Sequence, residues 1–234
     1  MKRFLSVIIL CSSLLTFSQK EGQENALFTI RGNIGIPRII GSQMFRTSFN
    51  GLYEGNLSVN VRLFNNFFVG AGYQNTQFQN NKKIFAYYQS NPQSGVYGTL
   101  SYNTRLLSSG AFIKVGYDKF FSDKGYATFS LNSGLMLNNY FNVNADTSLA
   151  NRPYVITDFS APYVQPEVSI NFIVEKHLAF SIMLSHTTMI YKFDPKAPRF
   201  AQFQEVKDTK NGAFMNWINI GFGFTILLDK KTKE

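Results

Sequence analysis

Few residues in this chain have the type and spacing that catalysis requires. The two histidines are His177 and His186, and Thr188 follows the second of them by two positions. On a β-strand such a pair shares one face, where an imidazole base could activate a hydroxyl nucleophile. The imidazole would need a carboxylate to orient it. Asp194 and Glu205 are candidates for that role by their proximity in sequence.

Metal, thiol and cofactor chemistry have little support in this sequence. Two histidines are too few for a His-rich metal site, and His177 lies in a predicted tight turn where solvation explains it. The single cysteine, Cys11, lies in residues 1–18, which have a basic start and an apolar core and predict a cleaved signal peptide. Cys11 also leaves a lipoprotein as an alternative, although the preceding Leu10 is bulky. We expect no metal, no disulfide and no cofactor.

A second set of residues is charged and interrupts otherwise uncharged alternating segments. Arg31, Arg62, Lys114 and Glu167 all fall on the face opposite the apolar one. They form a candidate charge network inside a closed sheet, where they could line a narrow ion path. Buried charges must pair to offset their desolvation, however, and Glu167 with either Arg31 or Lys114 would be a sufficient structural pair.

Other basic residues lie in long polar stretches. The formal net charge of +9 becomes about +7 once Lys2 and Arg3 are removed with the signal peptide, and such an excess favours anionic partners. Lipopolysaccharide phosphates are the natural candidates outside the cell, whereas nucleic acid is not expected for an exported chain. These residues could contact such a partner or simply solvate the loops: Lys82, Lys83, Lys192, Lys196, Arg199, Lys207 and Lys210.

The elements that must position these side chains are β-strands. In residues 214–228 apolar side chains recur at every second position, which is the period of a strand. This run exceeds the usual strand of about 5–6 residues and suits a tilted membrane strand, which needs roughly 9–11. Seven earlier segments alternate in the same way, at residues 28–36, 56–63, 67–75, 110–117, 126–140, 164–172 and 178–185.

The connections between these segments alternate in length. Long polar stretches fall at 39–54, 77–107, 141–161 and 191–212, and short ones at 64–66, 118–125 and 175–177. An up-and-down barrel would collect all the long loops at one mouth and the tight turns at the other. Pro166 lies inside a segment, and a closed barrel has no free edge for its missing N–H. We therefore expect a bulge or a later strand start at Pro166.

The chemistry of the two faces distinguishes a membrane barrel from a soluble one. The apolar face of all eight segments lacks charge, as a lipid-facing wall should, whereas a soluble barrel would carry charges outside. The 24 Phe and 12 Tyr suit aromatic girdles at the two membrane interfaces. We predict an all-β fold, an eight-stranded antiparallel up-and-down transmembrane β-barrel with short periplasmic turns and long extracellular loops. Residues 19–234 would form this single domain.

In this pattern the chain resembles the small eight-stranded outer-membrane barrels. That group includes the OmpA transmembrane domain, the OmpX-type proteins and the PorT-like outer-membrane β-barrel family. The resemblance covers residues 28–228 and is one of architecture. It implies a bacterial outer-membrane location and insertion by the barrel assembly machinery, which recognises aromatic residues in the last strand. Phe222 and Phe224 occupy that strand, although residues 229–234 extend beyond it.

Three functions are compatible with such a barrel. The first is a non-enzymatic scaffold that displays its loops for adhesion, envelope integrity or a secretion-accessory role, with outer-membrane lipid, lipopolysaccharide or an envelope protein as partner. The second is a narrow porin-like channel. The third is a lipid A-modifying enzyme, because lipid A deacylases are similar barrels with a His-x-Ser pair on the outer wall. Here Thr188 stands where those enzymes have serine.

Overall fold

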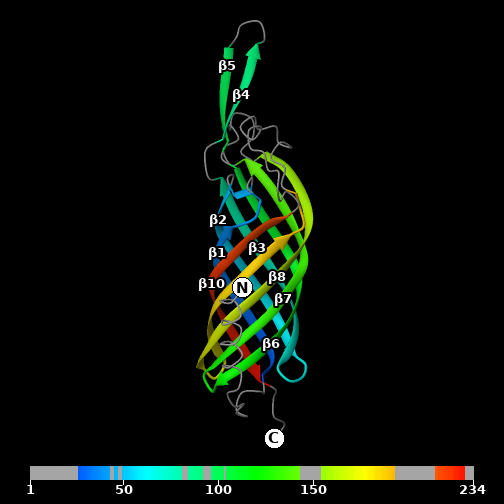
Figure 1. Ribbon diagram of the computed structural model, residues 1–234, viewed down its shortest axis with the longest axis vertical. Helices are drawn as coiled ribbons and strands as arrows, with labels where there is room; N and C mark the ends of the chain where they lie inside the picture. The colour runs from blue at the N-terminus through cyan, green and yellow to red at the C-terminus, as the bar shows by residue number, and fades with distance from the viewer. Residues whose placement is uncertain are drawn as a thin grey trace, which may run out of the picture.

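The predicted all-β fold is confirmed by a computed structural model, which describes residues 26–42, 45–46, 49–80, 84–91, 96–102, 104–142, 154–192 and 214–229. Eight antiparallel strands close into a barrel in up-and-down order (Figure 1). They are β1 (Ala26–Ile39), β2 (Phe49–Arg62), β3 (Phe67–Asn80), β6 (Thr104–Ser122), β7 (Gly125–Asn142), β8 (Tyr154–Glu175), β9 (Leu178–Met189) and β10 (Met215–Asp229). The other two strands, β4 (Ile84–Asn91) and β5 (Val96–Tyr102), pair with each other.

The last strand closes the barrel on the first, as the sequence pattern predicted. Phe28 lies opposite Leu228, and Ile36 lies opposite Ile220. Following the registers once around the barrel from Ile30 leads to Ile40, whose N–H donates to the Asn216 carbonyl at 3.0 Å. This offset of about ten residues is the shear of the barrel, which tilts its strands by roughly 35–45°. The successive cross-strand partners along this path around the barrel are Ile30, Val59, Ala71, Ile113, Ser133, Val164, Thr188 and Asn216.

Two of the three tight turns lie where the sequence placed them. Asn65 and Asn66 adopt positive φ angles of 44° and 67°, the conformation that joins twisted strands through two residues. A turn at Lys176 and His177 likewise joins β8 to β9. The prediction of a connection over 118–125 is wrong, because β6 continues to Ser122 and the turn is formed by residues 123–124. Asp118 therefore lies within a strand.

Three of the four long connections are shorter than predicted, because the strands continue into them, whereas the connection between β9 and β10 spans residues 190–214 against the predicted 191–212. β2 begins at Phe49, β6 at Thr104 and β8 at Tyr154, whereas the sequence pattern assigned these residues to loops. The hairpin formed by β4 and β5 lies inside the predicted loop 77–107. Figure 1 shows this hairpin projecting from the barrel at the end opposite the tight turns. Long connections at one mouth and short turns at the other are thus retained.

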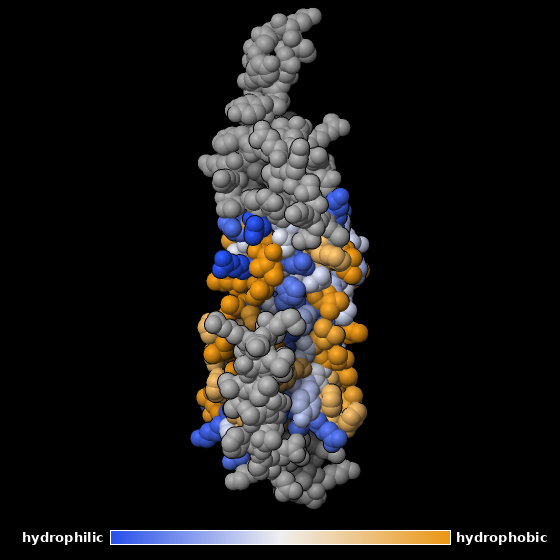
Figure 2. Space-filling model, in the orientation of Figure 1, coloured by the Kyte–Doolittle hydropathy of each residue, from blue (hydrophilic) through white to orange (hydrophobic). Residues whose placement is uncertain are grey.

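The outer wall of the barrel is apolar around its middle. Ile36, Ile113 and Ile220 are each more than 60% exposed, and in Figure 2 hydrophobic residues cover both flanks of the barrel at mid-height, with strongly hydrophilic ones gathered above and below. On β10 the outward apolar side chains run from Ile218 to Leu228. At about 3.3 Å per residue and a tilt near 42°, this run spans roughly 25 Å, the height of the apolar band of a membrane barrel.

Among the described residues, no helix is both long and apolar enough to cross a membrane.

The prediction of a bulge or a later strand start at Pro166 is wrong. Pro166 lies opposite Leu131 of β7 in unbroken register, and the pairing of β8 with β9 has the same register on either side of it. Ile190 donates its N–H to the Pro162 carbonyl, so alternate residues from Pro162 onward direct their backbone groups toward β9. No pairing with β9 is formed at residues 165 and 166. β8 therefore continues through Pro166 without a bulge, and it lacks one backbone hydrogen bond to β9 at this position.

Candidate functional site

Side chains from all eight barrel strands point into the interior and fill it. Glycines on this inner face make room for large neighbours, as crowding in a narrow barrel requires. A Cβ atom at Gly72 would overlap the ring of Phe112, and one at Gly116 would overlap the ring of Phe68. Both rings are buried. The polar groups of the interior are therefore held by packing as well as by hydrogen bonds.

The part of the interior nearest the tight turns contains an ion pair between β1 and β6. Arg31 Nη2 lies 2.9 Å and 2.7 Å from the two carboxylate oxygens of Asp118. Thr128 donates its hydroxyl to the same carboxylate at 2.7 Å, and Arg62 Nη2 approaches it at 3.5 Å. The Arg31 guanidinium also lies 4.4 Å from the centre of the Phe68 ring. This geometry pairs the two charges in a site from which water is largely excluded, and of the Arg31 guanidinium nitrogens only Nε has no hydrogen-bond partner among the described residues.

A second ion pair joins β6 to β8. Lys114 Nζ lies 2.8 Å from Glu167 Oε1, and Asn132 donates to Glu167 Oε2 at 3.3 Å. Both charged side chains are buried. The structure thus places Arg31, Arg62, Lys114 and Glu167 on the inner face and joins Glu167 to Lys114.

Sequence reasoning missed Asp118, the partner of Arg31, because two neighbouring polar residues at the end of a segment resemble a turn. One signal was available in the sequence: Asp118 follows the inward-facing Lys114 by four positions, so the two side chains share one face of the strand.

Closer to the long-loop mouth lies a carboxylate that sequence reasoning also missed. Glu54 is fully buried and accepts hydrogen bonds from Trp217 Nε1 at 2.6 Å and Gln165 Nε2 at 2.8 Å. Asn219 and Thr76 donate to it at 3.1 Å and 3.3 Å. Four neutral donors from three strands, β3, β8 and β10, thus hold this carboxylate. Glu54 was assigned to the end of a loop, although it has the same parity as the inward polar residues that follow it in β2.

An apolar layer caps the polar interior at this mouth. Phe45, from the short segment between β1 and β2, is fully buried, and its ring centre lies 5.1 Å from that of Phe78, 5.9 Å from that of Phe49 and 6.5 Å from that of Trp217. We call this layer the aromatic plug. The buried side chains packed with these four are Ile39, Leu106, Phe112, Met136, Tyr140, Ala161, Tyr163, Met189 and Met215.

The arrangement is suited to structure more than to reaction chemistry. The described interior contains three cations, Arg31, Arg62 and Lys114, and three carboxylates, Glu54, Asp118 and Glu167, so it is balanced in formal charge. Such balance offsets desolvation in a site of low dielectric constant. Within the described ranges, no group of three or more His, Cys, Asp or Glu side chains could hold a metal ion.

The histidine pair of the enzyme hypothesis lies on the outer wall. His186 is opposite Ile218 of β10, and the register of β8 with β9 brings Pro166 to its other side. Neither neighbour is a carboxylate. Thr188 lies opposite Asn216, while Asp194 and Glu205 are outside the described residues.

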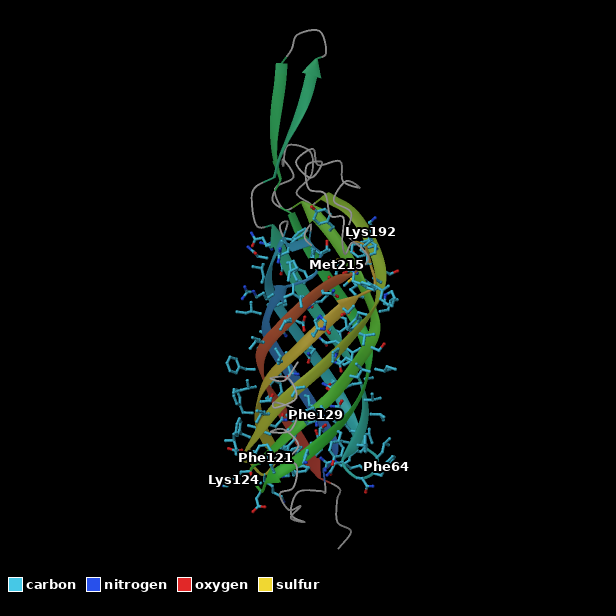
Figure 3. The ribbon with its side chains drawn as sticks, viewed as in Figure 1. Phe64, Phe121, Lys124, Phe129, Lys192 and Met215 are labelled. Carbon is cyan, nitrogen blue, oxygen red and sulfur yellow. The ribbon has the colours of Figure 1, made fainter. Side chains whose placement is uncertain are left out.

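His177 lies in its predicted turn, where Nδ1 is 3.1 Å from the Leu227 carbonyl oxygen. Of the candidate loop cations, Lys192 is exposed near the mouth with the long connections. Figure 3 shows it far from Phe64, Phe121 and Lys124, which lie at the opposite end. The predicted signal peptide at residues 1–18 is outside the described residues, as are six of the candidate cations: Lys82, Lys83, Lys196, Arg199, Lys207 and Lys210.

Comparison with known proteins yields structural likeness alone. No family model and no curated protein matches the sequence. Neisserial surface protein A has 13% identity and a TM-score of 0.48, over 89% of this chain and 100% of that one. Ail of Yersinia pestis, in complex with the heparin analogue sucrose octasulfate, has 8% identity and a TM-score of 0.44, over 85% and 97%. The outer membrane protease OmpT of Escherichia coli has 11% identity and a TM-score of 0.41, over 90% and 99%.

Likeness at this level transfers no activity to the chain. Its class follows from its own closed topology, shear and apolar outer wall. By its architecture, the chain is one of the small eight-stranded β-barrels of the outer-membrane type.

Proposed function

We propose that this protein is a non-enzymatic scaffold of the bacterial outer membrane, closed along its axis, that displays its extracellular segments to a partner. Adhesion, envelope integrity and an accessory role in secretion all use such a display. The apolar band of about 25 Å supports the location, because that height suits lipid. The filled interior is the observation that carries the proposal.

The interior supports a scaffold better than a channel. Two buried ion pairs and the Glu54 cluster occupy its polar length, and the aromatic plug crosses it at the extracellular mouth. An ion that entered would have to break paired charges and then pass an apolar layer, and both steps are costly. We therefore expect no conduction in planar bilayers. Discrete openings above the lipid background would favour the narrow porin-like channel instead.

The extracellular side supports a display role. The hairpin of β4 and β5 projects beyond the barrel and pairs only within itself among the described strands (Figure 1). Its free edges offer backbone donors and acceptors to a partner chain. The candidate loop cations, of which Lys192 is described, would add attraction to lipopolysaccharide phosphates or an acidic envelope protein.

A replacement of the hairpin tests the display role. Residues 82–103 would be exchanged for a short Gly/Ser linker, and envelope proteins that co-purify with the barrel would be compared with those of the wild type. A matched control would carry Lys124→Gln at the periplasmic end. We expect the linker variant to lose a partner that the control retains. Equal co-purification in all three would contradict a display role for this segment.

The enzyme alternative is tested separately. Mass spectrometry of lipid A from host cells that express the wild type should match that from cells expressing His186→Ala. A mass change that depends on His186 would contradict the non-enzymatic proposal.

A further inference from the structure

Toward the mouth with the long connections, polar side chains interrupt the apolar outer wall of β9, β10 and β1, and the exposed apolar residues Ile40, Ile190 and Phe214 lie beside or beyond them. We call Arg38, His186, Thr188 and Asn216 the outer-wall patch. Each occupies an outward position, in alternation with buried inward residues such as Trp217. Arg38 is exposed and the other three are half-buried.

The registers bring the patch together. Arg38 lies opposite Ile218, which in turn lies opposite His186, so Arg38 and His186 occupy one row two strands apart. Asn216 and Thr188 are direct cross-strand partners in the adjacent outward row. With strands about 4.8 Å apart, the Arg38 and His186 backbones are separated by roughly 10 Å. That distance is about the width of one lipid headgroup and within reach of a flexible arginine.

The chemistry of the patch favours an anion. A guanidinium, an imidazole, a hydroxyl and a carboxamide all supply hydrogen-bond donors, and neither row contains a carboxylate on these three strands. Arginine in particular matches the geometry of phosphate oxygens. Lys192 lies four residues beyond Thr188 and adds an exposed cation on the extracellular side.

The height of the patch identifies the source of the anion. On β10 the patch residue Asn216 follows directly above the apolar run from Ile218 to Leu228. A run of about 25 Å spans the hydrocarbon core, so the patch lies at the level of the outer-leaflet headgroups. A phosphate attached to a membrane lipid would be held there at high local concentration.

We propose that the outer-wall patch binds the phosphate group of a phosphorylated lipid of the outer leaflet. This inference rests on the proposed membrane location, because only a membrane-spanning barrel presents the patch to headgroups. Arg38 makes the charged contact, His186 and Thr188 donate from β9, and Asn216 closes the site from β10.

The test uses the barrel refolded in uncharged detergent micelles, with emission of Trp217, the single tryptophan, reporting unfolding in urea. Bisphosphorylated lipid A should raise the unfolding midpoint, whereas its dephosphorylated form should not. Arg38→Gln, and the double variant Arg38→Gln/His186→Gln, should weaken apparent affinity for lipid A about tenfold, as expected for the loss of a charge-assisted hydrogen bond. Lys119→Gln, at the other end of the wall, should bind as the wild type does.

Three results would overturn the inference: wild-type affinity in Arg38→Gln and the double variant, equal stabilisation by dephosphorylated lipid A, or equal stabilisation by inorganic phosphate alone. Arg38 is exposed, so Arg38→Gln should fold even if the double variant does not. If the wild type fails to insert into lipid vesicles at all, the proposed membrane function is contradicted, whichever lipid the patch prefers.

Discussion

At the scale of single residues, the buried pair of Lys114 and Glu167 should contribute strongly to stability. Lys114→Met leaves the Glu167 carboxylate buried with one amide donor, Asn132. We expect the free energy of unfolding to fall by about 3–5 kcal/mol, the usual cost of removing one partner of a buried ion pair. Urea unfolding followed through Trp217 emission measures it.

The control for this prediction removes both partners. Lys114→Met combined with Glu167→Leu replaces two desolvated charges with apolar side chains of similar size, so it should be within about 1 kcal/mol of the wild type. If the double variant loses as much stability as the two single variants together, the pair is not a coupled unit.

Glu54 should behave differently, because its partners are neutral donors. In Glu54→Gln an amide N–H₂ must face one of the groups that now donate to the carboxylate, from Trp217, Gln165, Asn219 or Thr76. We expect a loss of about 1–3 kcal/mol, the cost of a buried unsatisfied polar group, and an altered Trp217 emission. Glu175→Gln, at the exposed end of β8 beside the tight turn, is the matched control and should change neither quantity.

At the scale of the strand, Pro166 weakens the seam between β8 and β9. Pro166→Val supplies an N–H directed toward β9, where no pair is formed at present. The new ladder bond should raise the free energy of unfolding by about 0.5–1.5 kcal/mol. Hydrogen exchange should show a protected amide at position 166 and slower exchange at His186. Fast exchange at that amide would mean that the seam is held open by something other than the missing donor.

The segment between β1 and β2 contributes the centre of the aromatic plug. Phe45→Ala removes a ring that contacts Phe49, Phe78 and Trp217. We expect a loss of about 3–5 kcal/mol, as for other buried Phe→Ala changes, and a red shift of Trp217 emission as water enters. Phe64→Ala, at an exposed tight turn, should show neither effect. An unshifted emission in Phe45→Ala would mean that the remaining side chains close the mouth by themselves.

The strands themselves follow from the sequence because lipid imposes a strict rule on their outer face. Every outward position between Phe28 and Ile36 must be apolar or small, so the alternation is visible without a structure. In the proposed membrane location, the ends of β2, β6 and β8 at the long-connection mouth would lie above the lipid, where polar side chains are tolerated on both faces. The alternation fades there, and the sequence pattern assigned these residues to loops.

At the scale of the whole molecule, the pairing of interior charges depends on shear, which no local pattern specifies. Arg31 on β1 meets Asp118 on β6, 87 residues away and on a strand that is not its neighbour. The parity of each strand predicts which residues face inward. Which of them meet across the barrel depends on the offset of about ten residues around the ring. The sequence therefore could not predict which interior charges pair. It allowed only the prediction that Glu167 pairs with either Arg31 or Lys114.

The same closure predicts that the barrel is independent of its projecting hairpin. Each barrel strand is paired on both sides, and β4 and β5 form a separate two-stranded sheet. Replacing residues 82–103 with a short linker should therefore leave the free energy of unfolding within about 0.5 kcal/mol of the wild type, as for surface changes that remove no buried contact. Gel migration of the folded form and urea unfolding of the micelle-bound protein both measure it. A loss of several kcal/mol would show that the hairpin packs on the barrel mouth, and it would then be part of the folded core instead of a display element.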